Sequence, residues 1–300
     1  MVDYLKLTKD ETFNIVDKVN DHYSTFSDIE TYYRYKKKKR LENLPASLSL
    51  FGVGPENDLF NFPELAPKDM EFELVATTDT PEEGKILGRD YTKLLEITAS
   101  FNVDANVGRS IRFCVREKTT GKYVGFIKLG SPVLNIRPRN DYFGVKKTPL
   151  DLANKHFVNG FNIVPAQPFG FNCLGGKLLA LYCCSHEVRE FINNKYDDME
   201  VLFLETTSLY GSIKNVSQYD GLKPFMRHKG DTISKLLLNL PDELYKETRN
   251  FLVEKNGGPL YTTDKKLPTS IKMRTQDKIY SILKNNLKEY DSTKHAEFSN

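Results

Sequence analysis

Helical spacing of apolar residues dominates the first part of the chain. Apolar positions recur every three or four residues over 5–45, which places them on one side of a helix. Thr8 is followed three residues later by Glu11, as in a capping box, where each side chain bonds the other residue's backbone N–H. A second helix is expected over 28–44, stopped by Pro45. The pattern therefore predicts two helices before a loop-rich stretch.

The last part of the chain shows the same spacing. Residues 241–258 predict a helix that ends at Gly257, since glycine readily adopts the left-handed backbone that follows many helices. Residues 265–291 predict a basic amphipathic helix. Its apolar side is expected to consist of Ile271, Ile279, Ile282, Leu283 and Leu287.

Alternation with a period of two marks the middle of the chain. Residues 109–132 alternate and turn at "KTTGK", which predicts a β-hairpin. An apolar run at 157–164, a helical pattern over 176–195 and a buried strand over 200–205 follow. A strand, helix and strand of these lengths predict a βαβ unit with a parallel strand pair.

Together these elements predict an α+β protein. Its mixed sheet would hold an antiparallel hairpin followed by the βαβ unit, with helical extensions at both ends. The expected regions are a helical N-terminal region at 1–69, an α/β core at 70–240 and a basic helical region at 241–300.

Composition narrows the class of protein. The 300 residues are 39% hydrophobic and 28% charged, with a net charge of only +3, so a sizeable core is expected and the overall field does not require a polyanionic partner. The four cysteines show no CxxC spacing, so no metal site is expected. Reduced thiols, the lack of a signal-like apolar segment and the lack of a long apolar run favour a cytoplasmic protein.

The loop "GFNCLGGK" at 170–177 is the first candidate for chemistry. Helix N-termini present free N–H groups, and glycines allow a close approach, so this junction suits a phosphate. The candidate cofactor-binding residues are Asn172, Gly175, Gly176 and Lys177. Neither a Walker loop nor a dinucleotide fingerprint is present, so a tight turn without a ligand is the alternative.

The order of hairpin, strand, glycine loop, helix and strand is similar to the core of the GNAT N-acetyltransferases. In that family the glycine loop holds the pyrophosphate of acetyl-CoA. The resemblance implies an acyl-CoA or another phosphate-bearing donor. The motif differs here, with Gly170 where the family has Arg or Gln and Cys173 where it has a glycine.

A closer resemblance covers about 109–232. It is carried, in order, by "VGFIKLGSP", "RPRNDYFG", "NGFNIVPAQPFGFNCLGGKLLA", "LETTSLYGS" and "SQYDGLKPFMRHKGDT". These motifs resemble the DruA family of the Druantia anti-phage system and, more distantly, the GNAT-like Mom family of phage Mu, which modifies adenine in DNA. The resemblance implies a transferase that modifies a base in nucleic acid during phage–host conflict.

The motifs of this resemblance also supply candidate catalytic residues. Glu205, at the carboxyl end of a predicted strand, is expected to be the base that takes a proton from an amine. Ser131, Tyr210 and Tyr219 are candidate hydrogen-bond donors or acids. Each has a structural alternative, such as an ion pair for Glu205 or a turn for Ser131.

Basic residues suggest a nucleic-acid partner, DNA rather than RNA. Arginine and lysine clusters beside aromatic residues suit phosphates and stacked bases. The candidate nucleic-acid-binding residues are Arg137, Arg139, Arg227, Lys37, Lys38, Lys272 and Arg274. The alternatives are solvated helix faces at these clusters and, for the whole protein, an inactive GNAT fold that binds nucleic acid or a partner.

Overall fold

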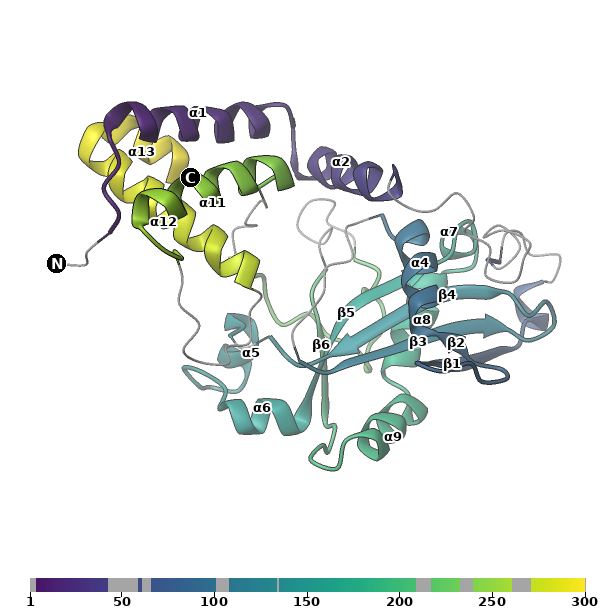
Figure 1. Ribbon diagram of the computed structural model, residues 1–300. Coiled ribbons are helices and arrows are strands. Elements are labelled where there is room, and N and C mark those ends of the chain that lie inside the picture. Colours follow the sequence, from purple (N-terminus) through teal and green to yellow (C-terminus); the bar gives the residue numbers. More distant parts are fainter. Residues whose placement is uncertain are drawn as a thin grey trace. The chain divides into compact units, whose positions relative to one another are not determined.

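The computed structural model describes residues 4–42, 59–60, 66–100, 108–133, 135–208, 217–232, 240–260 and 271–299. The chain divides into two compact units (Figure 1). Residues 1–32 and 234–300, from its two ends, form one unit, called here the helical unit. Residues 33–233 form the other, called the sheet unit.

The helical unit contains α1 (Lys9–Ser24), α11 (Asp242–Asn256), α12 (Ile271–Tyr290) and α13 (Ser292–Ser299). Two predictions about helix ends are confirmed: Thr8 and Glu11 form the capping box, and α11 ends at Gly257 with a φ of 66°. Apolar side chains of α1, α11 and α12 share one core. The expected apolar side of α12 is buried except for Ile271, which is 64% exposed. That prediction was wrong because Ile271 is the first residue of the helix, before the buried stripe begins.

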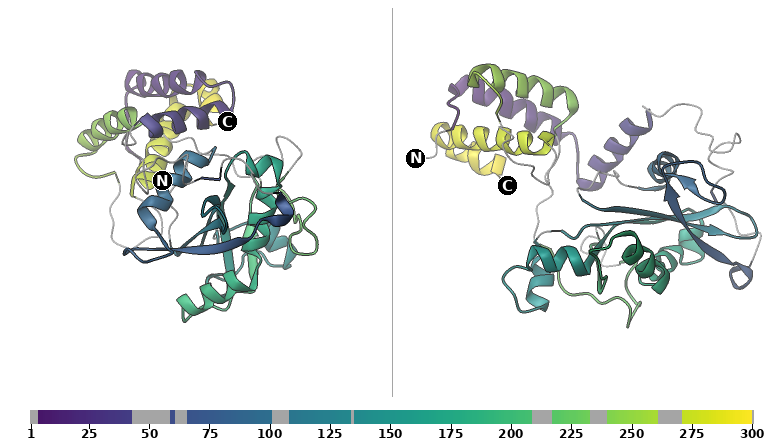
Figure 2. Two further views of the ribbon diagram at one scale, coloured as in Figure 1. Left: turned by 90° about the vertical axis from the view of Figure 1, so that its right-hand side faces the viewer. Right: turned by 60° about the horizontal axis from the view of Figure 1, so that its bottom comes forward.

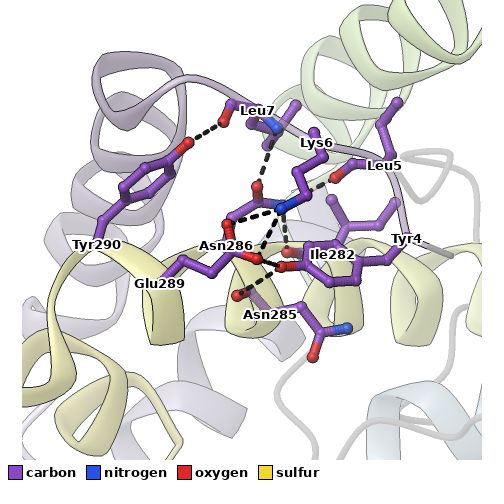
Figure 3. A network of polar contacts seen from close by, with 9 residues as sticks. All are labelled: Tyr4, Leu5, Lys6, Leu7, Ile282, Asn285, Asn286, Glu289 and Tyr290. Carbon is purple, nitrogen blue, oxygen red and sulfur yellow. Dashed lines mark hydrogen bonds and ion pairs between the residues drawn. The ribbon is translucent and has the colours of Figure 1, made fainter. Parts of the chain in front are cut away.

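A polar network ties the segment before α1 to α12 (Figure 3). The buried amide of Asn286 accepts a hydrogen bond from the Leu7 backbone N–H at 2.9 Å and donates to the Leu5 carbonyl at 2.9 Å. Glu289 pairs with Lys6 at 2.8 Å, and the Tyr290 hydroxyl donates to the Leu7 carbonyl at 2.6 Å. Because these bonds satisfy backbone groups of an extended segment, they fix its position on the helix.

The sheet unit is built on a six-stranded sheet in the order β2-β1-β3-β4-β5-β6. The strands are β1 (Phe72–Thr78), β2 (Ile86–Leu87), β3 (Ser110–Glu117), β4 (Tyr123–Gly130), β5 (Phe157–Pro165) and β6 (Phe203–Thr206). Strands β1, β3, β4 and β5 pair antiparallel, whereas β2 and β6 pair parallel to their neighbours. The predicted α+β class, the hairpin and the parallel β5–β6 pair are confirmed.

Helices cover both faces of this sheet (Figure 2). Helix α4 (Gly88–Thr98) packs on one face, with Tyr91, Leu94 and Leu95 buried against Cys114 and Phe126. Helices α8 (Gly175–Cys183) and α9 (His186–Lys195) cover the other face. Every residue of β4 is buried as a result. The remaining helices are α2 (Ile29–Glu42), η1 (Pro67–Asp69), α5 (Arg137–Tyr142), α6 (Leu150–His156) and α7 (Phe169–Asn172).

Two predictions about the βαβ unit were wrong. The single helix expected over 176–195 is two helices, because the Ser185 side chain accepts a hydrogen bond from the Val188 backbone N–H and starts a new helix. The expected buried strand is also an edge strand, so Phe203 is 40% exposed.

Candidate functional site

A cavity of about 690 Å³ lies in the sheet unit beside β6 and is called here the β6 cavity. Its walls come from β6, α5 and the segment 217–232, and from the start of β5. Strand β6 reaches this place because it pairs parallel to β5 at the edge of the sheet. The carboxyl end of a parallel edge strand is a common location for ligand sites in α/β proteins.

The register of β5 and β6 arranges the floor of the β6 cavity. Phe157 pairs with Phe203, and Asn159 pairs with Glu205. Paired residues share a face of a sheet. The two phenylalanine rings stack at 4.8 Å with an interplanar angle of 24°. Val158 and Leu204, which alternate with these residues, pack against the core, and Phe157, Phe203 and Glu205 line the cavity.

A buried ion pair between α5 and β6 also lines the cavity. The Arg139 guanidinium donates through one nitrogen to both Glu205 oxygens, at 2.9 and 3.1 Å. Arg139 is also held by the Thr148 hydroxyl at 3.2 Å and the Val133 carbonyl at 2.9 Å. The two charged side chains are only 5% and 14% exposed.

Burial raises the pKa of Glu205 above its ordinary value, and the charge and hydrogen bond of Arg139 oppose that effect only in part. The carboxyl therefore takes up a proton more readily than an exposed glutamate. A desolvated carboxyl that lines a cavity is a candidate acid–base group.

Aromatic side chains form one wall of the cavity. Phe143 makes edge contacts with Phe157 at 5.6 Å and Phe203 at 5.2 Å. Tyr142 is 56% exposed and Phe225 is 66% exposed, and both line the same cavity. Exposed aromatic rings gathered in a concave site are typical of ligand binding.

Cationic side chains border this aromatic wall. The Lys229 ammonium lies 3.5 Å from the centre of the Tyr142 ring, a cation–π contact. Arg227 is exposed two residues before Lys229 and also lines the cavity. The His228 ring between them lies 3.2 Å from the Asp231 carboxylate. The positions of Arg227 and Lys229 suit the phosphate of a ligand whose planar part occupies the aromatic wall.

Tyr219 also lines the cavity. Its hydroxyl oxygen lies 3.3 Å from that of Thr206, which in turn donates to the Gly160 carbonyl at 2.9 Å. Burial raises the pKa of Tyr219. The phenol therefore stays protonated near neutral pH and acts in hydrogen bonding.

The glycine loop is packed against its own chain. A Cβ atom on Gly175 would lie 2.6 Å from the Phe169 ring, and one on Gly176 would lie 3.0 Å from the Gln218 side chain. The Lys177 ammonium donates to the Asp220 carbonyl. Gly175, Gly176 and Lys177 do not line the β6 cavity, and neither does the exposed Asn172. The two glycines therefore have a packing role, and donor binding at this loop stays a prediction.

The other predicted catalytic residues are spread over the chain. The Ser131 hydroxyl accepts from the Arg109 backbone N–H at 3.0 Å and is not part of the cavity wall. Tyr210 lies outside the described residues. The structure thus brings Glu205 and Tyr219 together in one cavity with Arg139 and Arg227.

The remaining basic candidates lie elsewhere. Arg137 is 74% exposed and pairs with Asp141 at 3.5 Å. Lys37 donates to the carbonyls of Ile97 and Ala99 at the end of α4, while Lys38 is exposed on α2. In the helical unit, Lys272 pairs with Asp242, and Arg274 is half-buried on α12. Their role in nucleic-acid binding stays a prediction.

Sequence reasoning missed the aromatic wall. Tyr142 and Phe143 follow directly after the arginine cluster, and Phe225 precedes "RHK". The sequence therefore held a signal for this wall, since an aromatic residue lies next to each of the two basic groups. The pairing of Asn159 with Glu205 on neighbouring strands cannot be recognised from adjacent residues in the sequence.

The described part of the chain contains neither a metal-binding cluster nor a helix that could span a membrane. No cluster of three or more His, Cys, Asp or Glu side chains there is arranged to hold a metal ion. Over the same residues, each helix is too short or too polar to span a membrane.

Comparison with known proteins identifies the family. Residues 63–277 match the family model described as Druantia protein DruA. A curated relative, the Druantia protein DruA of Escherichia coli (strain UMEA 4076-1), is 26% identical over 176 residues. That alignment covers 54% of this chain and 43% of the relative, so the chain matches less than half of the relative's length. Because the family model spans most of the sheet unit and continues to residue 277, this chain belongs to the DruA family.

Proposed function

We propose that the β6 cavity receives a single nucleic-acid base and that this DruA-family chain transfers a group to it, as part of anti-phage defence. The observation that supports the proposal is that three features line the same cavity of about 690 Å³. These are the aromatic wall around Tyr142 and Phe143, the exposed cations Arg227 and Lys229, and the buried carboxyl of Glu205.

Each feature matches one part of a nucleotide. Bases stack on aromatic side chains without regard to sequence. Arginine and lysine neutralise the phosphates on either side. A base cannot reach such a cavity from inside a duplex, so the substrate would be single-stranded or the base would be extruded from the helix. The chain's small net charge of +3 agrees with a local contact rather than a long basic groove.

Glu205 would serve the transfer as the proton acceptor. The exocyclic amine nitrogen of the base would form a bond to the acyl carbon of a thioester donor, and the bond from that carbon to the thiolate would break. Glu205 would take the amine proton and pass it to the departing thiolate. The upward shift in its pKa favours both steps, because the best acid–base groups titrate near the working pH.

A GNAT-like order and pairing of the strands is part of this proposal. It is supported by the antiparallel β3–β4 pair and by the parallel β5–β6 pair joined through α8 and α9. The donor would be an acyl-CoA or another phosphate-bearing molecule.

A binder without chemistry is the second candidate. The observation in its favour is the contact of Gly175 with the Phe169 ring, which fills the junction where a donor was expected. In this case the β6 cavity would capture a base, or a partner would occupy it, without further reaction.

The test is to incubate the protein with single-stranded DNA and acetyl-CoA, digest the DNA and weigh the nucleosides by mass spectrometry. A nucleoside heavier by one acetyl group, absent with Glu205→Gln but present with Glu200→Gln, would support the transferase. Glu200 is a suitable control because its side chain is 61% exposed and lies just before β6. Base-dependent binding without a new nucleoside would support the binder. The absence of DNA binding would overturn both the transferase and the capture of a base.

A further inference from the structure

We infer that Thr148 and Asn140 are positioning residues for the buried ion pair that lines the β6 cavity. Neither of them lines the cavity itself, and they act on Glu205 through Arg139. The inference deepens the proposed function and rests on it, because it names the residues that prepare the proposed proton acceptor without touching a ligand. It is drawn from a buried chain of hydrogen bonds that runs from Asn140 through Thr148 and Arg139 to Glu205.

The donors and acceptors of this chain can be arranged in only one way. The Thr148 backbone N–H lies 3.2 Å from Asn140 Oδ1 and can only donate, so the Asn140 amide presents its oxygen to Thr148. The same oxygen accepts from the Thr148 hydroxyl at 2.8 Å. Because the hydroxyl proton points to Asn140, the Thr148 oxygen presents its lone pairs to Arg139 Nε, which lies 3.2 Å away and can only donate. Thr148 is therefore a fixed acceptor for Arg139.

Asn140 is anchored on its other side. Its amide nitrogen donates to the Asn135 side chain at 2.8 Å and to the Lys146 carbonyl at 3.3 Å. Its backbone carbonyl accepts from the Val145 N–H at 2.9 Å. Asn140 and Thr148 are only 3% and 7% exposed, and a buried polar network with its partners in place is rigid. The segment between α5 and α6 thus forms a firm support for the threonine hydroxyl.

This support directs Arg139 at Glu205. The guanidinium is held at Nε by Thr148 and at Nη1 by the Val133 carbonyl, which fixes its plane. Nη1 then donates to both carboxylate oxygens of Glu205, at 2.9 and 3.1 Å. A freely rotating arginine would also be attracted to a phosphate of the ligand. The support therefore reserves Arg139 for Glu205 and leaves the phosphate to the exposed cations Arg227 and Lys229.

The position of Arg139 decides how readily Glu205 keeps its negative charge. Burial raises the pKa of Glu205, whereas the charge and hydrogen bond of Arg139 lower it. Loosening Arg139 should therefore raise the pKa of Glu205 further. A carboxyl that is protonated at the working pH cannot accept a proton from an amine. Thr148 and Asn140 thus keep the proposed proton acceptor ready to act.

Other ionisable groups surround the same cavity. On the neighbouring strand, the residue opposite Glu205 is the uncharged Asn159. Burial raises the pKa values of Cys184 and Tyr219, so both stay neutral near neutral pH. The other charged or titratable side chains of the cavity wall are Tyr142, Asp220, Arg227, His228, Lys229 and Asp231. A substitution at Thr148 alters none of these groups, so a difference from the wild type reports on Arg139 and Glu205.

The experiment titrates Glu205 by NMR in protein that is isotope-labelled at the glutamate carboxyl carbon, and Glu205→Gln identifies the signal by its loss. Thr148→Val removes the hydroxyl and keeps a β-branched side chain, and the midpoint of the Glu205 titration should move to higher pH. Thr148→Ser retains the hydroxyl and should restore the wild-type midpoint. Thr92→Val is the matched control. It removes a hydroxyl of α4 that donates to the Gly88 carbonyl at 2.8 Å, and it should leave the midpoint unchanged.

The wild-type protein supplies a second measurement, which does not require a folded variant at Thr148. The Arg139 Nε–H proton should exchange slowly with water, because the side chain is 5% exposed and Nε is bonded to Thr148. Rapid exchange of this proton would overturn the inference.

The titration uses no ligand, so its outcome is separate from that of the proposed function. An unmoved midpoint in folded Thr148→Val, or an equal movement in Thr92→Val, would overturn the positioning role. If the midpoint moves as expected, the pH profile of base modification should move to higher pH with it, while DNA affinity stays the same. A moved midpoint in a protein that neither binds nor modifies DNA would support the positioning of Arg139 and overturn the proposed function.

Discussion

The guanidinium of Arg139 and the carboxylate of Glu205 meet at 2.9 and 3.1 Å although they lie 66 residues apart in the chain. The pair joins α5 to the edge strand β6 and closes the floor of the β6 cavity. Both side chains are almost fully buried. Removing one partner therefore leaves a buried charge without compensation, which is far more costly than losing a surface pair.

Arg139→Ala should lower the free energy of unfolding of the sheet unit by about 3–5 kcal/mol. Hydrogen–deuterium exchange of peptides from β5 and β6 would measure the change. Arg137→Ala is the matched control on the same helix, and its exposed pair with Asp141 should contribute less than about 1 kcal/mol. If both variants lower the free energy of unfolding equally, the buried pair does not stabilise the sheet unit more than the exposed pair.

The stability of the sheet unit should depend on the ionisation of Glu205. Because burial raises its pKa in the folded protein, the native state binds this proton more readily than the unfolded state does. The resulting stability is fully present below the ordinary glutamate pKa and is lost as the pH rises through the raised pKa. The difference in unfolding free energy between the wild type and Glu205→Gln should therefore change as the pH rises above about 4, the ordinary glutamate pKa. If this difference does not change with pH, the pKa of Glu205 is not raised in the folded protein.

Gly175→Ala should destabilise the sheet unit. Alanine usually stabilises a helix relative to glycine by roughly 0.5–1 kcal/mol. Here its Cβ would lie 2.6 Å from Phe169 ring atoms and 3.1 Å from the Gly170 Cα, and such overpacking costs about 1–3 kcal/mol. Gly258→Ala, whose Cβ would meet nothing within 4 Å, is the control in thermal unfolding. A more stable Gly175→Ala protein would show that the glycine is not required for packing.

Arg227→Ala should weaken binding of single-stranded DNA without changing base preference. Loss of one phosphate contact should reduce the slope of log K against log salt by about 0.7 for a single strand. Titrations from about 50 to about 200 mM salt would measure it, with the exposed Lys155 on α6 changed to alanine as the control. An unchanged slope would mean that Arg227 does not contact a phosphate of the bound DNA.

Asn286→Leu should release the segment 4–8 from α12. The change removes the hydrogen bonds to the Leu7 N–H and the Leu5 carbonyl (Figure 3). Faster hydrogen–deuterium exchange in a peptide covering this segment is expected, with α8 and α9 unaffected. Unaltered exchange would mean that the Tyr290 and Glu289 contacts suffice.

Local pattern predicted most elements of this fold, and the misses have physical causes. The capping box and the β3–β4 hairpin depend on neighbours in sequence, so spacing alone found them. The break at Ser185 was hidden because apolar residues continue through it. The same limit applies to the site. Glu205 and Arg139 were expected to have separate roles, one in catalysis and one on a phosphate, with an ion pair as the alternative for Glu205. Only the tertiary fold identifies Arg139 as its partner.

The helical unit combines residues 1–32 with residues 234–300, and this has a consequence for synthesis of the chain. Helix α1 leaves the ribosome long before α11 and α12 exist, with Val16 and Val19 lacking the core that will bury them. At the usual speed of translation the wait is on the order of tens of seconds. The sheet unit, whose sequence is continuous, has that time to fold first. A nascent chain would therefore hold a folded sheet unit and an α1 helix whose apolar side is exposed. Such a helix is suited to binding by a chaperone until α11 and α12 have been synthesised.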